Sequence, residues 1–359
     1  MEGKAAALAF LLLSGAHHLA LATDLPDPPP NEREVAQLNV TLVVFDPGIR
    51  ENEAPDRQSG VFPEIRKIEA RYLPYLLRKT LVETDEWGAV RVVPETEPAA
   101  ELLVSGMIAK SDGVSLELRL RAVDSTGREW LNQPYAGTAA NLEDKDETGT
   151  GTVEPFQYLY DRIAADLYAA RARLDEGELS KIVEVSLLRY ANELAPEAFG
   201  EYLATGPDGS LEISRLPARG DPMIQRVERI REFEYLFTDT MDEQYEALFR
   251  EIASTYDLWR RYRRQLARYM LAEEQRMQNG DSRGSRGSYG TMKQNYENYR
   301  WTKIQEQKLQ KWATGFNNEV APTVMELEGR VVELKGGLEA RYDEWRGILT
   351  SIYLLETGE

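Results

Sequence analysis

The sequence of 359 residues contains no cysteine and only two histidines, His17 and His18. The lack of cysteine excludes disulfides, thiol nucleophiles and cysteine ligands for metals. No stretch approaches 18 consecutive apolar residues, so the sequence predicts no transmembrane helix. The polar chemistry that remains is that of carboxylates, arginines, lysines, tyrosines and serines.

The first 22 residues have the pattern of a signal peptide. Lys4 precedes an apolar run from Ala5 to Leu13, and Ala20-Leu21-Ala22 matches a small-residue cleavage site. The apolar run is too short to cross a bilayer. We therefore predict cleavage after Ala22 and a periplasmic product.

Cleavage would also remove both histidines. The mature chain would then have no imidazole, which excludes Ser-His-Asp and Cys-His catalytic groups and the usual zinc ligand sets. No cysteine follows the apolar run, so an acylated-cysteine lipid anchor is excluded as well. Any association with the outer membrane would have to go through a partner.

The charge balance is strongly acidic, with 61 Asp and Glu against 43 Lys and Arg and a net charge of −18. Nucleic acids and anionic lipid surfaces are themselves polyanions and would repel such a chain. We therefore expect no nucleic-acid partner.

Residues 38–175 alternate strand and helix patterns, after a proline-rich and acidic segment, residues 23–37, that predicts an extended leader. A helical spacing covers residues 64–84, and Pro74 predicts a kink or break because it leaves the Ala70 carbonyl unpaired. The other predicted strands and helices are residues 39–46, 89–93, 101–109, 115–124, 128–135 and 155–174.

The strand at residues 115–124 alternates apolar and charged side chains. Its apolar positions are Leu116, Leu118, Leu120 and Ala122, and its charged positions are Glu117, Arg119 and Arg121. Such alternation indicates one packed face and one face open to water or a partner. We therefore predict an α+β fold, a small mixed sheet with helices on one face, in the order strand, helix, four strands, helix.

This order resembles the small envelope domains of the TolB N-terminal, CsgG and LpoB-like type. The similarity lies in VTLVVFDPG (residues 40–48), ELLVSGMIAKSDG (residues 101–113) and SLELRLRAVDSTGREW (residues 115–130), and it covers residues 38–175. The resemblance implies an interaction domain of the cell envelope and carries over no catalytic residue. The whole chain resembles an exported protein of a Gram-negative bacterium.

The second half reads as helical, with a helical connector at residues 176–220 and a long antiparallel helical hairpin at residues 221–359. The helices of the connector are predicted over residues 178–205, with a break at Pro196. Asp221-Pro222 predicts the start of a long helix, with Asp at the N-cap and Pro at the first helical position. Apolar residues recur about every 3.5 positions from Val227 to Tyr269, which is the coiled-coil period. A Gly- and Ser-rich tip at residues 279–290 interrupts the hairpin. Helical spacing then resumes from Trp312 to Leu334, with Pro322 as a kink, and a closing helix follows. Whether the long helices pack on each other or on another chain stays open.

Three segments are candidate binding sites. The acidic loop Asp144, Asp146, Thr148 and Glu154 matches the first half of a calcium loop, but Pro155 occupies the twelfth position, so a solvated loop is favoured. Residues 256–270 are basic and aromatic, and the tip carries two further arginines. The candidate partner-binding residues are Arg260, Arg261, Arg263, Arg264, Arg268, Arg283 and Arg286. For residues 256–270 the favoured interpretation is a helix with Trp259, Tyr262 and Leu266 in the seam and its arginines on the outside, bridging to the acidic remainder of the chain.

Together these patterns predict a non-catalytic, exported structural or adaptor protein of the bacterial envelope. Its expected partners are envelope proteins and, through the helical arm, a second copy of the chain. We predict no catalytic residue, no cofactor and no metal apart from the calcium candidate. The alternatives are a glycan or peptidoglycan hydrolase that uses two carboxylates, and a ligand- or calcium-binding sensor.

Overall fold

The computed structural model describes residues 37–49, 62–139, 154–278, 307, 323–327, 330–334 and 336–357. The predicted signal peptide, the predicted leader up to residue 36, and the predicted tip at residues 279–290 lie outside these residues. No helix among the described residues is long and apolar enough to cross a membrane.

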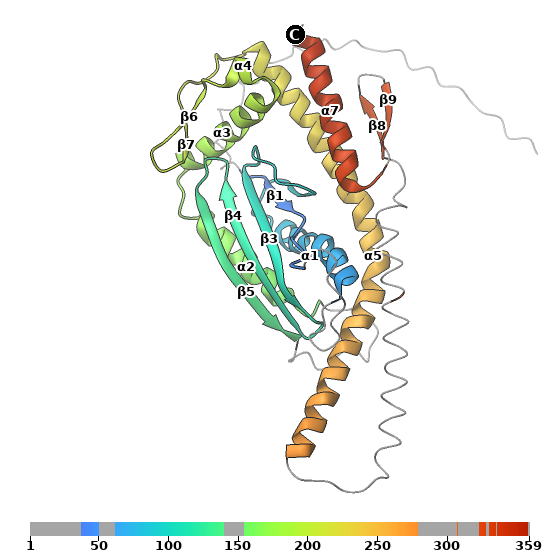
Figure 1. Cartoon of the computed structure of the whole chain (residues 1–359). Coiled ribbons are helices and arrows are strands. Elements are labelled where there is room, and N and C mark those ends of the chain that lie inside the picture. Colours follow the sequence, from blue (N-terminus) through green and yellow to red (C-terminus); the bar gives the residue numbers. More distant parts are fainter. Residues whose placement is uncertain are drawn as a thin grey trace, which may run out of the picture. The chain divides into compact units, whose positions relative to one another are not determined.

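A five-stranded mixed sheet forms the first part of the fold (Figure 1). The strand order is β2-β1-β3-β4-β5; β1 runs parallel to β2 and β3, whereas β4 runs antiparallel to both of its neighbours, β3 and β5. The strands are β1 (Val40–Val43), β2 (Val90–Val93), β3 (Leu102–Ser111), β4 (Ser115–Asp124) and β5 (Glu129–Thr138). The α+β class and the mixed sheet are confirmed.

Two helices, α1 (Pro63–Glu83) and α2 (Gln157–Arg171), cover one face of this sheet (Figure 1). The alternating side chains of the strands meet the apolar sides of both helices in one buried cluster. Its members include Leu42, Val104, Leu118, Leu120, Leu73, Leu77, Ile163 and Leu167. Burial of this apolar surface is the main force that closes the sheet onto its helices.

The predicted break at Pro74 is wrong, because α1 runs unbroken from Pro63 to Glu83. The Ala70 carbonyl that Pro74 leaves free accepts a hydrogen bond from the Phe45 backbone N–H at 2.8 Å. Phe45, two residues after the end of β1, thus supplies the donor that proline lacks, so the Ala70 carbonyl is not left unpaired.

The connector is only partly helical. Helices α3 (Glu176–Leu194) and α4 (Pro196–Phe199) are followed by a short hairpin of β6 (Leu203–Thr205) and β7 (Leu211–Ile213). The helical prediction for residues 200–205 is therefore wrong. The cause is local, because Gly206 to Ser210 turns the chain back, with Gly209 in the left-handed region at φ 84°.

One long helix, α5 (Pro222–Gln278), dominates the second half (Figure 1). Its 57 residues correspond to about 85 Å. Asp221 caps its start, since the carboxylate accepts a hydrogen bond from the Met223 N–H at 2.9 Å. The predicted long helix and its cap are confirmed.

The apolar stripe predicted for α5 is buried over residues 227–259. Eight predicted positions are buried, namely Val227, Ile230, Phe237, Met241, Tyr245, Ile252, Tyr256 and Trp259, whereas Phe233 and Leu248 are only half-buried. The stripe packs on α1, α3 and the C-terminal helix α7 (Leu338–Thr357) in one cluster. Over this length the stripe is covered by other helices of the same chain, so it is not free to pair with a second copy.

The helix predicted from Trp312 to Leu334 is wrong at its end. Strands β8 (Thr323–Leu327) and β9 (Arg330–Leu334) form an antiparallel hairpin there. Thr323, Met325 and Leu334 point inward and are buried, whereas Val324 and Val331 are 59% and 72% exposed. The valine-rich alternation with period 2 therefore prevails over the helical spacing. The rest of the predicted helix, residues 312–322, lies outside the described residues.

Candidate functional site

The face of the sheet opposite α1 and α2 is the most extended feature that could meet a partner. In the described part of the chain no helix covers this face over β4 and β5 (Figure 1). It presents exposed side chains from both strands. They are Glu117, Arg119, Arg121, Asn132, Pro134 and Ala136. We call these six residues, with the half-buried Met107 of β3, the open face.

The two edges of the sheet are each blocked against addition of a further strand. On β5, Pro134 has no backbone N–H to donate to a neighbouring strand. On β2, the side chains of Arg78 and Asp242 bond the outer backbone groups. Arg78 Nε donates to the Val90 carbonyl at 2.8 Å, and the Val92 N–H donates to Asp242 at 3.3 Å. A partner would therefore meet the open face rather than an edge.

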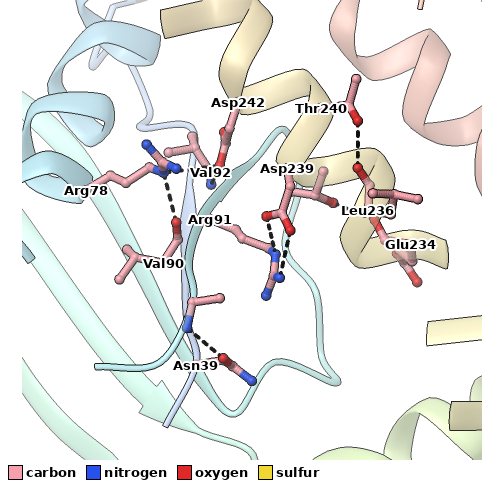
Figure 2. A network of polar contacts seen from close by, with 12 residues as sticks. Asn39, Arg78, Val90, Arg91, Val92, Glu234, Leu236, Asp239, Thr240 and Asp242 are labelled. Atoms are coloured by element: carbon pink, nitrogen blue, oxygen red, sulfur yellow. Dashed lines mark hydrogen bonds and ion pairs between the residues drawn. The ribbon is translucent and has the colours of Figure 1, made fainter. Parts of the chain in front are cut away.

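Figure 2 shows how α5 closes the β2 edge. Arg78 and Asp242 also pair with each other at 3.2 Å, so together they act in place of a neighbouring strand. One turn away, Arg91 of β2 forms a two-pronged ion pair with Asp239, at 2.8 and 3.0 Å. Burial raises the pKa of Asp242 to about 7, against the opposing effect of Arg78.

A second polar junction lies where the loop between β2 and β3 meets α5 and α7. Glu97 of the loop and Glu234 of α5 are both buried, and Arg346 of α7 reaches both, at 3.8 and 2.9 Å. Burial, and then the neighbouring Glu234, raise the pKa of Glu97 to about 7. The carboxylates here are thus bound into contacts between elements.

A further buried carboxylate, Glu69 of α1, has no exposed surface. The hydroxyls of Ser111 and Tyr256 both donate to its Oε1 at 2.6 Å, and Arg66 Nε lies 3.5 Å from its Oε2. Burial is the main cause that raises its pKa. Glu69 thereby connects α1, the end of β3 and α5.

The structure separates the predicted arginines into two groups. Arg260 is 1% exposed and forms a two-pronged ion pair with Glu154, at 2.7 and 2.8 Å, besides pairing with Asp257. Arg263 donates to the Asp112 carbonyl at 3.1 Å, and Arg264 is half-buried. Arg261 and Arg268 are exposed on α5. Arg283 and Arg286 lie outside the described residues.

The calcium candidate is only partly described. Asp144, Asp146 and Thr148 lie outside the described residues, whereas both carboxylate oxygens of Glu154 accept hydrogen bonds from Arg260. Among the described residues no three acidic side chains cluster in a way that could hold a metal ion.

A small hollow lies between α1, α5, α7 and the β2 edge, with Tyr75, Tyr245 and Phe249 among its walls. It has room for one or two water molecules at its centre. Asp242 is the one carboxylate among the described residues that line it. A two-carboxylate hydrolase needs a second acid about 5 to 10 Å away and room for a sugar.

The buried acids Glu69, Glu97 and Asp242 were not singled out by the sequence analysis. One signal was present on α5, where polar residues recur with helical spacing beside the apolar stripe. They are Arg231, Glu234, Thr238 and Asp242, and all four are buried. Such a stripe also occurs on an exposed helix face, so the sequence does not reveal its burial.

A scan against models of known protein families gives no match, and no curated protein matches this chain in sequence. The proposals below therefore depend on the geometry of the chain and on the sequence patterns described above.

Proposed function

We propose that this protein is a non-catalytic interaction protein of the bacterial envelope that binds a partner protein through the open face of its sheet. The observation that carries the proposal is a ten-residue β4 strand whose outward positions Glu117, Arg119 and Arg121 are exposed beside exposed positions of β5. A pleated surface of this kind offers a wide area with fixed side-chain spacing.

Two further observations support this use of the open face. Blocked edges at Pro134 and at the Arg78–Asp242 pair disfavour uncontrolled strand pairing, so the face can be exposed without promoting aggregation. The open face also carries both charges, with Glu117 on the same strand as Arg119 and Arg121. Mixed charge suits specific contact with a protein better than attraction to a polyanion.

Binding to a partner can be tested with charge reversal on the open face. The full chain carrying Arg119→Glu and Arg121→Glu should lose a partner that the wild-type chain retains from an envelope extract. The matched control is Lys79→Glu with Arg173→Glu, which reverses two exposed charges on the helical side and should retain the partner. Equal retention by both double variants would contradict the proposal.

The proposed location is periplasmic, after removal of residues 1–22, and it is tested separately. The chain expressed in a Gram-negative host should fractionate with periplasmic contents and begin at Thr23 when its N-terminus is sequenced. A cytoplasmic product that begins at Met1 would contradict this part of the proposal without touching the binding test.

A second candidate function is hydrolysis of a glycan by carboxylates, and the raised pKa values of Glu97 and Asp242 favour it. A general acid for glycosidic cleavage needs such a pKa. Against it, Arg346 lies 3.8 Å from Glu97 and Arg78 lies 3.2 Å from Asp242. Release of soluble fragments from purified peptidoglycan by the wild-type chain, but not by Glu97→Gln with Asp242→Asn, would favour the hydrolase over the interaction protein.

A further inference from the structure

The junction around Glu97 joins four parts of the chain at one buried point. Glu97 belongs to the loop between β2 and β3, Glu234 to α5, Arg346 to α7, and Ser186 to α3. Glu97 and Glu234 are only 7% and 4% exposed. Few of these charges can therefore be screened by water.

The loop is fixed to its neighbours by directed hydrogen bonds. The Ala99 carbonyl accepts from Ser186 Oγ at 2.6 Å and from Arg231 Nη2 at 3.1 Å. Two residues on, the Glu101 carboxylate accepts from the Asn39 N–H at 2.7 Å. Any displacement of Glu97 would strain these bonds, because they follow it within four residues of chain.

Two buried carboxylates, Glu97 and Glu234, share the guanidinium of Arg346, at 3.8 and 2.9 Å. Glu193 and Arg189 of α3 lie nearby and add one charge of each sign. A proton on Glu97 would leave Arg346 facing one ionised carboxylate, Glu234, in place of two. The titratable groups that face this set are Glu193, Tyr190 and Arg189 of α3, Arg231, Glu234 and Tyr235 of α5, and Tyr342 and Arg346 of α7.

Arg231 acts on Glu97 through its charge, but its hydrogen bonds go to other groups. Its Nη2 donates to Ser186 Oγ at 2.6 Å and to the Ala99 carbonyl, and its guanidinium lies over the rings of Tyr190 and Tyr235. Arg346 is closer to Glu234, at 2.9 Å, than to Glu97, at 3.8 Å. Of the two carboxylates that share Arg346, Glu97 is thus the more weakly paired, and the proton is best placed there.

We propose that this junction is a proton-operated latch between the β2–β3 loop and the α5–α7 pair, closed while Glu97 carries a proton and loosened when Glu97 ionises. An ionised Glu97 would stand beside Glu234 with one shared arginine, and the loop would open to give it water. The latch does not depend on the proposed partner binding.

The sign of the pH effect follows from linkage. In the closed junction the pKa of Glu97 is about 7, whereas in an opened loop it returns toward its ordinary value of 4.5. The opened form therefore holds fewer protons between these values, and opening becomes more favourable as the pH rises. From pH 6 to pH 8 the opening equilibrium should increase roughly tenfold.

Hydrogen exchange of the full chain tests the latch. After correction for the ordinary acceleration of exchange by base, peptides covering residues 94–101 should lose protection roughly tenfold between pH 6 and pH 8. Glu97→Gln should abolish this loss, because the amide keeps the shape and never ionises. Glu95→Gln, an exposed neighbour in the same loop, should retain it.

Two results would overturn the latch. One is unchanged protection of residues 94–101 in the wild-type chain between pH 6 and pH 8, and this result decides the matter even if Glu97→Gln fails to fold. The other is a folded Glu97→Gln chain that keeps the full loss of protection.

Discussion

The two stretches of α5 that meet the α/β part of the fold do so with opposite chemistry. Residues 231–242 contact the β2 edge and the β2–β3 loop through ion pairs, such as Arg91 with Asp239. Residues 249–259 contact α1 through aromatic rings. Tyr72 lies 5.3 Å from Phe249 and 5.5 Å from Tyr256, and Phe62 lies 6.2 Å from Trp259, measured between ring centroids. We call these the charged contact and the aromatic contact.

The difference shows how one helix can be attached permanently at one place and conditionally at another. Burial of aromatic rings does not titrate, so the aromatic contact should hold over a wide pH range. Buried ion pairs add little net stability, because the cost of desolvating the charges offsets their attraction, but they determine which groups contact each other. The strength of the ion pairs at the charged contact depends on whether Glu97 and Asp242 are protonated. The charged contact is thus the one that a change of pH can loosen.

The largest expected effect is loss of the aromatic contact by Trp259→Ala. Trp259 is 1% exposed and stacks on Tyr256, so its removal should lower the free energy of unfolding by about 3 to 5 kcal/mol. Urea unfolding measures this. Leu258→Ala, at a neighbouring position that is 41% exposed, should cost under about 1 kcal/mol. A similar decrease in the free energy of unfolding in the two variants would contradict the assignment of the aromatic contact as the stable attachment of α5.

A smaller effect is expected where the aromatic contact touches a charge. Tyr256→Phe keeps the ring but removes the hydroxyl that donates to Glu69, and should cost about 1 to 2 kcal/mol. The matched control is Tyr158→Phe, whose half-exposed hydroxyl bonds weakly to the Thr138 carbonyl at 3.4 Å. If Tyr256→Phe leaves the free energy of unfolding unchanged, the hydrogen bond from α5 to Glu69 does not stabilise the fold.

The charged contact should show its pH dependence through Asp242→Asn. The folded chain holds a proton on Asp242 up to about pH 7, whereas the unfolded chain releases it near 3.8, so wild-type stability should fall as the pH rises from 5 to 8. In the asparagine variant, the decrease in the free energy of unfolding between pH 5 and pH 8 should be smaller than in the wild-type chain by about 1 kcal/mol or more. A residual slope from Glu97 should remain. Identical slopes of urea midpoint against pH in the two chains would count against the charged contact.

The smallest effect is expected for the ion pair that Arg121 of the open face forms with Glu129 of β5. Arg121 and Glu129 pair at 2.7 Å, but their side chains are 55% and 43% exposed. Arg121→Ala should therefore change the free energy of unfolding by about 0.5 kcal/mol or less. A loss above about 1 kcal/mol would mean that this face is part of the structural framework rather than a free surface.

The sequence predicts the elements that depend on local patterns. The β4 alternation and the stripe of α5 repeat with the periods of a strand and a helix, so their burial could be predicted before any contact was known. The cap at Asp221 is equally local. The same reasoning predicts the open face, because Arg119 and Arg121 fall between buried leucines.

The sequence does not predict features whose partners are distant along the chain. The Ala70 carbonyl that Pro74 leaves free within α1 accepts a hydrogen bond from Phe45, which follows β1 and lies 25 residues away along the chain. The buried stripe of Glu234 and Asp242 depends on Arg78 and Arg346, which lie more than 100 residues away along the chain. The β8–β9 hairpin was missed because Val324 and Val331 fit a helical period as well as a strand period.

Site-specific photocrosslinking in living cells tests the proposed function most directly. A photoreactive residue at Ala136, exposed on the open face, should give a protein adduct, and one at Tyr168, exposed on the helical side, should give none above background. The adduct at Ala136 should also disappear when Arg119→Glu and Arg121→Glu are present. An adduct at Tyr168 with none at Ala136 would contradict binding through the open face.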